Sequence, residues 1–222
     1  MENPSPPPTP DAADRAAHFA AIRARKKAEA EAVGVDAVFI GEFYFSLVVL
    51  WVVIIFAGFS VLKARAFKLV GSIKDAMLIA FGTSTSEAAY PRVLIEMERF
   101  GCSNKIVSFV LPLGYSFNLD GSMMYMTFAS LFLAQSYGIH LTFSHQLTML
   151  LILMLTSKGV AGVPRASLVV IAGTIAMFDI PEAGLALLIG IDPLLDMGRS
   201  ATNVLGNAMA TAVVSKWEGE LD

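Results

Sequence analysis

Residues 190–217 read GIDPLLDMGRSATNVLGNAMATAVVSKW, a stretch in which polar and charged residues interrupt an apolar sequence at regular intervals. Five polar residues recur along it at steps of 4, 3, 4 and 4 positions: Asp192, Asp196, Arg199, Asn203 and Asn207. Side chains three or four positions apart lie on the same face of an α-helix. We therefore predict a helix over about 183–215, in which one face carries two carboxylates, a guanidinium and two amides.

The composition is that of an integral membrane protein. Of the 222 residues, 55% are hydrophobic and only 16% are charged, and the mean hydropathy is +0.64. An ordinary soluble domain has about 25% charged residues. The net charge of −3 argues against a nucleic acid partner, because such a protein needs a basic surface. The single cysteine, Cys102, allows no internal disulfide and no CxxC metal site. Without a catalytic triad order, a phosphate loop or a metal cluster, we expect neither an enzyme nor a bound cofactor.

One apolar segment is long enough to cross a bilayer by itself. Residues 43–62 carry no charge, and a helix of about 20 apolar residues spans a hydrocarbon core ~30 Å thick. We predict a spanning helix over about 43–63. Basic residues from Lys63 onward place its C-terminal end in the cytoplasm, whereas the basic cluster at 23–27 favours the opposite orientation.

Residues 1–40 differ from the rest of the chain. Prolines at five of the first ten positions prevent a helix there, and residues 11–32 are rich in alanine. We expect a disordered, low-complexity segment over 1–40, with a short exposed helix as the alternative for 11–32. Residues 41–222 form the predicted membrane domain.

The apolar segments after residue 75 are short and interrupted by polar residues. An ungapped repeat marks two of the interruptions: Thr83-Ser84 and Pro91-Arg92 recur as Thr156-Ser157 and Pro164-Arg165. Paired interrupted segments are typical of transporters, in which unwound backbone near the middle of the membrane binds the cargo. We predict a first helical hairpin over about 68–100, a broken helix over about 105–139 and a second hairpin over about 145–180.

Several charged residues lie within or beside these apolar segments. Glu87 and Asp120 join the charges of the 190–217 stretch. A charged side chain at the centre of a bilayer costs about 2.5–3.5 kcal/mol on insertion scales. We therefore expect these side chains to face the interior of the helix bundle and to have a functional role, rather than to form a purely structural ion pair.

The sequence resembles the dicarboxylate/amino acid:cation symporter family, which includes the glutamate transporters. The resemblance covers about 41–222 and is carried by the 190–217 stretch together with AFGTSTSEAAYP (80–91), GYSFNLDGS (114–122) and TSKGVAGVP (156–164). It implies an all-α integral membrane fold: the transport-domain core, with two re-entrant hairpins and discontinuous helices, without the N-terminal scaffold helices.

The resemblance also implies a substrate site. Arg199 would bind the side-chain carboxylate of the substrate, Asp192 would hold the guanidinium in place, and Asp196 would bind the α-amino group. Further contacts would come from Ser86, Ser122, Ser200, Asn203, Gly162 and Val163. Because C4-dicarboxylate carriers of the family usually lack an aspartate at the position of Asp196, its presence favours an acidic amino acid, glutamate or aspartate, as substrate.

Three sodium sites are implied in the same way. One would use backbone oxygens of Gly114, Asn118 and Asn203. Another would use backbone oxygens of Ser116, Ser157, Lys158 and Val160. A third would use the side chains of Asn118 and Asp120. Oxygen ligands suit sodium because it is a hard cation.

The chain departs from the family pattern at two cation-related positions. Asn207 stands where sodium-driven archaeal and animal members have aspartate, which predicts a weakened sodium site. Met126 stands where animal members have a proton-carrying glutamate, so potassium-coupled exchange is not supported. Glu87, at the tip of the first hairpin, is our candidate proton carrier. We expect coupling to sodium, to protons, or to both.

Members of the family are about twice as long as this chain and form homotrimers through scaffold helices that are absent from it. We therefore expect a truncated symporter of acidic amino acids in the cell inner membrane, in contact with the lipid bilayer. The first alternative is a C4-dicarboxylate:cation symporter. The second is a membrane subunit, or an inactive fragment, that binds ligand without transport.

Overall fold

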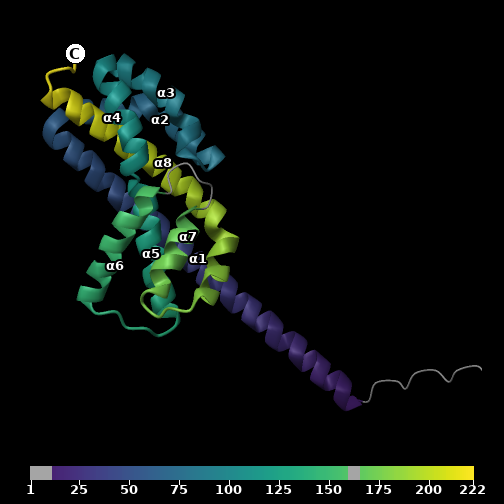
Figure 1. The fold of residues 1–222 in the computed structure, drawn as a ribbon. Helices are drawn as coiled ribbons and strands as arrows, with labels where there is room; N and C mark the ends of the chain where they lie inside the picture. Colours follow the sequence, from purple (N-terminus) through teal and green to yellow (C-terminus); the bar gives the residue numbers. More distant parts are fainter. Residues whose placement is uncertain (1–11, 160–165) are drawn as a thin grey trace, which may run out of the picture. The chain divides into compact units, whose positions relative to one another are not determined.

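The computed structural model is all-helical over the part of the chain that it describes (Figure 1). The backbone is described for residues 12–159 and 166–222, and the side chains for 37–158, 167–186 and 188–222. The elements are α1 (Ala12–Leu62), α2 (Arg65–Thr83), α3 (Ser86–Phe100), α4 (Asn104–Phe117), α5 (Asp120–Ser136), α6 (Phe143–Thr156), the 3₁₀ turn η1 (Ser157–Gly159), α7 (Ala166–Ala176), the 3₁₀ turn η2 (Glu182–Gly184) and α8 (Leu185–Trp217). The chain divides into two units between Phe39 and Ile40.

The backbone of the first unit is helical from Ala12 onward, as the first part of α1. Alanine has the highest intrinsic helix propensity, and the segment after Ala12 is rich in it. The expectation of a disordered, low-complexity segment over 1–40 stays a prediction, and residues 1–11 lie outside the described part of the chain.

The second unit begins with the apolar end of α1. Residues Ala37–Leu62 form a helix that is long and apolar enough to cross a membrane, and the predicted span of 43–63 lies almost entirely within it. Large apolar side chains on this helix are exposed, among them Phe45, Val52 and Phe56. Two shorter apolar helices, α6 and most of α7, follow later in the chain.

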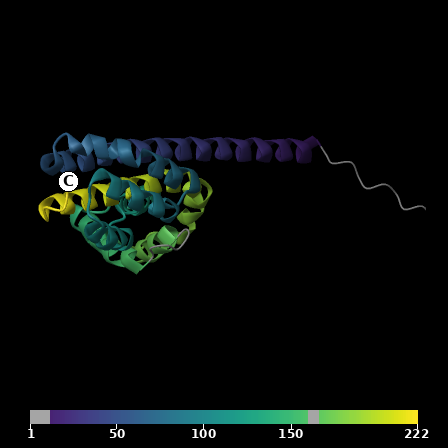
Figure 2. The same cartoon turned by 90° about the horizontal axis from the view of Figure 1, so that it is seen from above.

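Helix α8 is the centre of the second unit. It packs against α2, α3, α4, α5 and α7 (Figure 1). In the perpendicular view of Figure 2, it lies between the end of α1 and the green helices α6 and α7. Small buried side chains such as Ala201 and Ala208 allow this close packing on several sides. The helix predicted over about 183–215 therefore holds the domain together, and its polar face lies inside the protein.

Two helix pairs pack around α8. Helices α2 and α3 are joined at Ser84-Thr85, where Ser84 has a left-handed φ of 53°. An ion pair of 3.4 Å between Arg92 Nη2 and Asp75 Oδ2 shows that α3 runs back along α2. Helices α6 and α7 form the second pair. The repeated sequence falls at both junctions, because Thr83 ends α2 and Thr156 ends α6.

A break separates α4 from α5. Asn118 and Leu119 have φ values of −114° and −106° with ψ near 70°, outside the helical region. The N–H of Asn118 still bonds to the carbonyl of Gly114 at 2.6 Å, and α5 begins at Asp120. The interruption therefore lies within the Asn118-Leu119-Asp120-Gly121 segment where the sequence places it.

The chain end beyond α8 is tied to the turn between α3 and α4. The N–H of Ser103 donates to the Glu220 carbonyl at 3.1 Å, and the N–H of Asp222 donates to the Gly101 carbonyl at 3.0 Å. Gly101 has a φ of 109°, and a Cβ there would lie 3.1 Å from the Asp222 carbonyl oxygen. Arg65, at the start of α2, also donates to Asp222. These contacts anchor the chain end after α8 to two parts of the domain, the α3–α4 turn and the start of α2.

Candidate functional site

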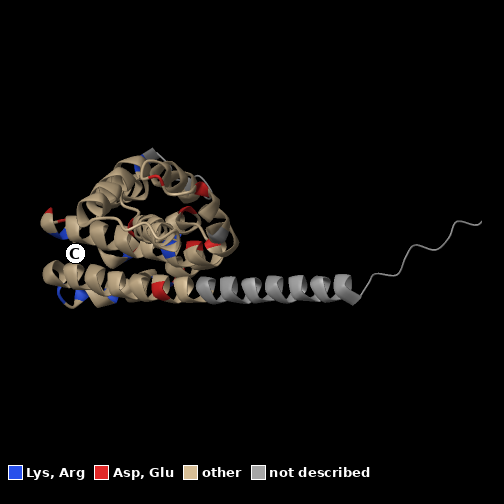
Figure 3. Cartoon of the chain, turned by 90° about the horizontal axis from the view of Figure 1, so that it is seen from below, with Lys and Arg blue, Asp and Glu red and all other residues tan. Residues whose placement is uncertain are grey.

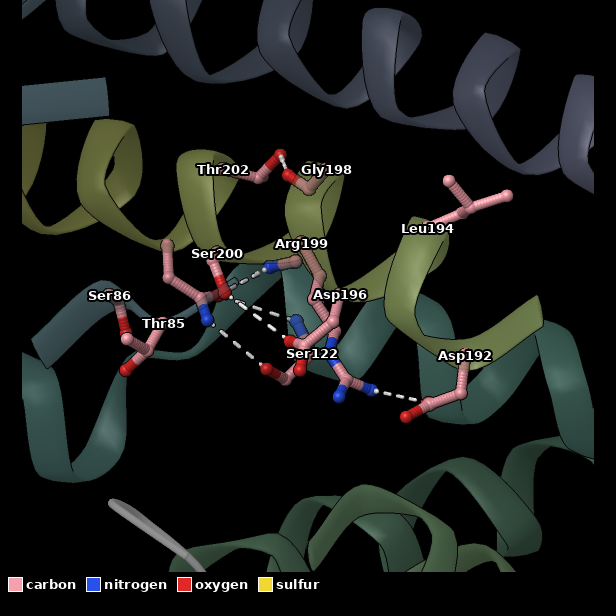
Figure 4. Close-up of polar contacts among 12 residues, drawn as sticks. Thr85, Ser86, Ser122, Asp192, Leu194, Asp196, Gly198, Arg199, Ser200 and Thr202 are labelled. Carbon is pink, nitrogen blue, oxygen red and sulfur yellow. Dashed lines mark hydrogen bonds and ion pairs between the residues drawn. The ribbon is translucent and has the colours of Figure 1, made fainter. Parts of the chain in front are cut away.

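A charged cluster lies on the buried face of α8 (Figure 4). Arg199 is only 3% exposed. Its Nε donates to Asp196 Oδ1 at 2.5 Å and its Nη1 donates to Asp192 Oδ1 at 3.5 Å. The guanidinium carbon lies 4.6 Å from the ring centre of Tyr125 on α5, at cation–π distance. The sequence-predicted trio is thus brought together, with one turn of helix between successive members.

Several polar atoms of this cluster have no hydrogen-bond partner among the described residues, including the buried Asp192 Oδ2 and the Tyr125 hydroxyl. Arg199 Nη2 makes no hydrogen bond or ion pair with the described residues, because Nε and Nη1 carry its contacts to the two carboxylates. Asp196 Oδ1 accepts from both Arg199 and Ser200, whereas no described residue donates to Oδ2. The Asp196 side chain is 20% exposed. A hydrogen-bond donor on Arg199 and an acceptor on Asp196 are therefore available on two residues that contact each other.

Asn203, one turn after Ser200, joins α8 to the first turn of α5. Its Oδ1 accepts from the backbone N–H of Gly121 at 2.9 Å and of Ser122 at 3.3 Å. Its Nδ2 donates to Ser122 Oγ at 3.1 Å. The first N–H groups of a helix have no partner within the helix, so the Asn203 amide satisfies two of them from another element. Ser122 and Asn203, both predicted site residues, are in direct contact.

The α4–α5 break presents a second polar cluster to α8. Asn118 Nδ2 lies 3.3 Å from Asp120 Oδ2 and 3.3 Å from Asn207 Oδ1. Close approach to α8 requires glycine on both sides of this contact: a Cβ at Gly114 would lie 2.5 Å from Asn207 Oδ1, and a Cβ at Gly206 would overlap the Asp120 carboxylate. Four of the predicted cation-site residues are therefore neighbours in space.

The start of α3 lies apart from these bonds. Ser86 is 4% exposed, and its hydroxyl lies 3.4 Å from Glu87 Oε2. Thr85 donates to the same Glu87 oxygen at 2.6 Å. Figure 4 shows Thr85 and Ser86 beside the α8 cluster without a bond to it. Glu87 itself is exposed.

The second helix pair contributes Ser157 and Lys158. Ser157 is buried, and its hydroxyl donates to the Met154 carbonyl at 3.1 Å. The Lys158 ammonium donates to the backbone carbonyl of Phe117 at the break. The hydroxyl of Ser116 donates within α4, to the Pro112 carbonyl at 3.2 Å. The remaining predicted site residues lie outside the described residues: Val160, Gly162 and Val163.

Three contacts of the site were not predicted from the sequence. The ring of Tyr125 under Arg199 could have been inferred, because Tyr125 lies one turn after Ser122 and so shares its face of α5. The other two contacts join segments that are far apart in the chain. Gly206 lies beside Asp120, and the Lys158 side chain contacts α4. Periodicity carries no signal for such contacts.

Most of the ribbon of the second unit is neither acidic nor basic (Figure 3). The side chain of Arg65, at the start of α2, contacts Asp222 at the chain end. Two acidic residues of α8, Asp192 and Asp196, lie at the site. Among the described residues, no group of three or more His, Cys, Asp or Glu side chains is arranged to hold a metal ion.

Comparison with known proteins decides the family. The model of the sodium:dicarboxylate symporter family matches residues 16–217. The chain belongs to this family. The resemblance carried by the four motifs is therefore confirmed, and with it the expectation of a transporter family rather than an enzyme family. The match begins at residue 16, earlier than the residue 41 that the motifs indicate.

Relatives in the family carry two kinds of name. The chain is 48% identical over 185 residues to a proton/sodium-glutamate symport protein of Bacillus subtilis, a match that covers 83% of this chain and 42% of the relative. It is 47% identical over 192 residues to a C4-dicarboxylate transport protein of Agrobacterium fabrum, with 84% and 42% covered. A C4-dicarboxylate transport protein of Pseudomonas syringae pv. tomato is 51% identical over 166 residues, with 74% and 35% covered.

The chain thus spans about two fifths of the length of these relatives. Family membership and the apolar span Ala37–Leu62 together identify a membrane protein.

Proposed function

We propose that the chain forms the substrate- and cation-binding part of a secondary active symporter for acidic amino acids. One observation carries this proposal: Arg199 and Asp196 are joined through Nε and Oδ1, while Arg199 Nη2 and Asp196 Oδ2 make no contact that uses them among the described residues. An acidic amino acid offers a carboxylate to the first group and an α-ammonium to the second. Arginine suits this task because its planar guanidinium keeps its remaining donors aligned after two have been used.

Each neighbour of Arg199 has a defined part in this binding. Asp192, which is 1% exposed, fixes the guanidinium from one side, and Tyr125 supports its face. Ser200 and Ser122 line the same region of α8 and α5, and Asn203 positions the start of α5. The N-terminal end of α3 at Ser86 supports an anionic group, since helix N-termini attract carboxylates. Gly162 and Val163 complete the proposed contacts from the second helix pair.

The charge balance of the site supports coupling to cations. Arg199 and the two carboxylates of Asp192 and Asp196 sum to one negative charge. An acidic amino acid carries a further negative charge. Burying this excess in a membrane is costly unless cations enter with the substrate. We infer that sodium, protons or both bind together with the substrate.

The proposed sodium ligands lie around the α4–α5 break. They are backbone oxygens of Gly114, Asn118 and Asn203, with Asn207 beside them; the Asn118 and Asp120 side chains; and backbone oxygens of Ser116, Ser157, Lys158 and Val160. Breaks inside membrane proteins expose backbone carbonyls that act as cation ligands. In the same proposal the two helix pairs are re-entrant hairpins. The protein resides in the inner membrane. Any homotrimer forms through residues outside this chain.

The choice between acidic amino acids and C4-dicarboxylates depends on Asp196. A C4-dicarboxylate has no ammonium group, so its second carboxylate would face the unpaired Asp196 oxygen. Asp196→Ser removes that carboxylate and keeps a hydroxyl. In proteoliposomes with imposed sodium and proton gradients, we expect this variant to lose L-aspartate uptake and to gain succinate uptake relative to the unmodified chain. The exposed Asp75→Ser serves as the matched control.

Two results would contradict the proposed symport of acidic amino acids and favour another function. Better uptake of succinate than of L-aspartate by the unmodified chain would favour the dicarboxylate symporter, in agreement with the names of two relatives. Saturable binding without gradient-driven uptake would favour a binding subunit.

Glu87 is the proposed proton carrier, because its exposed carboxylate lies at the junction of the first helix pair beside Thr85 and Ser86. If it carries the proton, Glu87→Gln abolishes the pH dependence of uptake. An unchanged pH profile assigns proton coupling to another group. The exposed Glu98→Gln, on the same helix, is the control.

A further inference from the structure

Lys158 connects the second helix pair to the break between α4 and α5. It lies in η1 directly after α6, and its ammonium donates to the backbone carbonyl of Phe117, the last residue of α4. The two residues are 41 positions apart in the chain. The last carbonyls of a helix carry the negative end of its dipole. The Lys158 ammonium therefore lies at the end of α4, where the helix dipole attracts a cation.

The Phe117 carbonyl is open to this contact for a local reason. In an uninterrupted helix it would accept from the N–H four residues later, at Gly121. That N–H instead donates to Asn203 Oδ1 on α8 at 2.9 Å. Asn203 thereby satisfies the start of α5 and leaves the end of α4 with an unpaired acceptor. Lys158 supplies the missing donor.

The surrounding charges favour a single cation at this position. Asp120, the first residue of α5, is attracted by the Lys158 charge. The described residues that α8 brings to the break carry neutral amides. They are Asn203 and Asn207, and Asn207 is 1% exposed with no acceptor for its Nδ2 among the described residues. Asn118 contacts the side chains of Asp120 and Asn207. One carboxylate and one ammonium thus balance at the break without a free ion.

We propose that the Lys158 ammonium is a tethered cation, which occupies a cation position at the end of α4 and competes there with a free monovalent cation. The inference deepens the proposed function, on which it rests for the role of cations, by assigning one of the charges at the break to the protein itself. It also explains why residue 207 is an asparagine. A second carboxylate at that position would need a second cation to balance its charge, and the single Lys158 ammonium cannot provide one.

The test measures sodium binding without substrate. The full chain, purified in detergent, is heated in sodium chloride or choline chloride at constant ionic strength, and the unfolding temperature is recorded over a sodium titration. An ion that binds only the folded protein raises this temperature. Lys158→Gln removes the competing charge, so its apparent sodium dissociation constant should fall about tenfold or more. Lys158→Arg keeps the charge and should titrate like the unmodified chain, as should the exposed Lys68→Gln.

Equal sodium titrations for Lys158→Gln and the unmodified chain would overturn the inference. If Lys158→Gln does not fold in choline chloride, Lys158→Met is measured in the same way. Folding of the neutral variants only at high sodium concentration would also support a cation requirement. Loss of folding in every variant at this position, Lys158→Arg included, would show that the side chain has only a packing role. Because unfolding requires no substrate, these outcomes do not depend on whether L-aspartate is the cargo.

Discussion

Replacement of Asn203 by alanine tests how the structure assembles the site. The Asn203 amide accepts from the N–H groups of Gly121 and Ser122, at 2.9 and 3.3 Å, and donates to Ser122 Oγ at 3.1 Å. In Asn203→Ala, both N–H groups lose their acceptor inside the protein. A buried donor left without a partner costs about 1–3 kcal/mol, and loss of a helix cap costs ~1 kcal/mol. Because the second bond is long, we expect a loss of about 2–4 kcal/mol in the free energy of unfolding.

The assay is thermal unfolding of the purified chain in detergent, followed by helical circular dichroism. A loss of 1 kcal/mol lowers the unfolding temperature by about 2–4 °C in a domain of this size, so Asn203→Ala should lower it by roughly 5–15 °C. Asn203→Asp keeps an acceptor for both N–H groups and should lose less. Asn104→Ala is the control, because the Asn104 amide bonds to Glu98 on the exposed surface. An Asn203→Ala protein that unfolds within about 2 °C of the unmodified chain would refute the capping role.

Three further predictions concern burial and packing. Arg199→Ala leaves the Asp192 carboxylate buried without its cation, which should cost about 3–5 kcal/mol in thermal unfolding, and the added change Asp192→Asn should restore part of that loss. Gly206→Ala forces a methyl group onto the Asp120 carboxylate and should cost about 1–3 kcal/mol in the same assay. Burial raises the pKa of the Cys102 thiol, which lies in the turn between α3 and α4. Its thiolate fraction at pH 8 is therefore below that of a free thiol. N-ethylmaleimide should modify Cys102 slowly until the chain unfolds.

Matched measurements decide each of these three predictions. For the buried ion pair, the single variant Arg199→Ala is compared with the double variant that also carries Asp192→Asn. Equal stability of the two would contradict the claim that Arg199 compensates the buried charge of Asp192. Gly82 has open space at its Cβ position, so Gly82→Ala should have little effect, and equal costs at Gly206 and Gly82 would contradict the close approach of Asp120. Rapid labelling of folded Cys102 near pH 8 would contradict its burial.

The polar face of α8 could be predicted from the sequence because it depends on spacing alone. Steps of three and four positions placed Asp192, Asp196 and Arg199 on one face, and the structure brings the three side chains together. The helix break at Asn118 was equally predictable, because polar residues and a glycine interrupt an apolar run there. Both features are local, so a short stretch of sequence contains the physical cause.

Contacts between distant segments could not be predicted in this way. The Lys158 ammonium reaches Phe117 only because Asn203 has taken the N–H of Gly121, and three separate segments must be positioned before this contact exists.

The most direct test of the account is equilibrium binding of radiolabelled L-aspartate to the purified, membrane-inserted chain. We predict saturable binding that is strengthened by sodium or by lower pH, that succinate displaces only weakly, and that is lost in Arg199→Gln and in Asp196→Ser. Folded, inserted protein that binds no L-aspartate, or that binds it equally well without the Arg199 guanidinium, would contradict the assignment of the substrate site to α8.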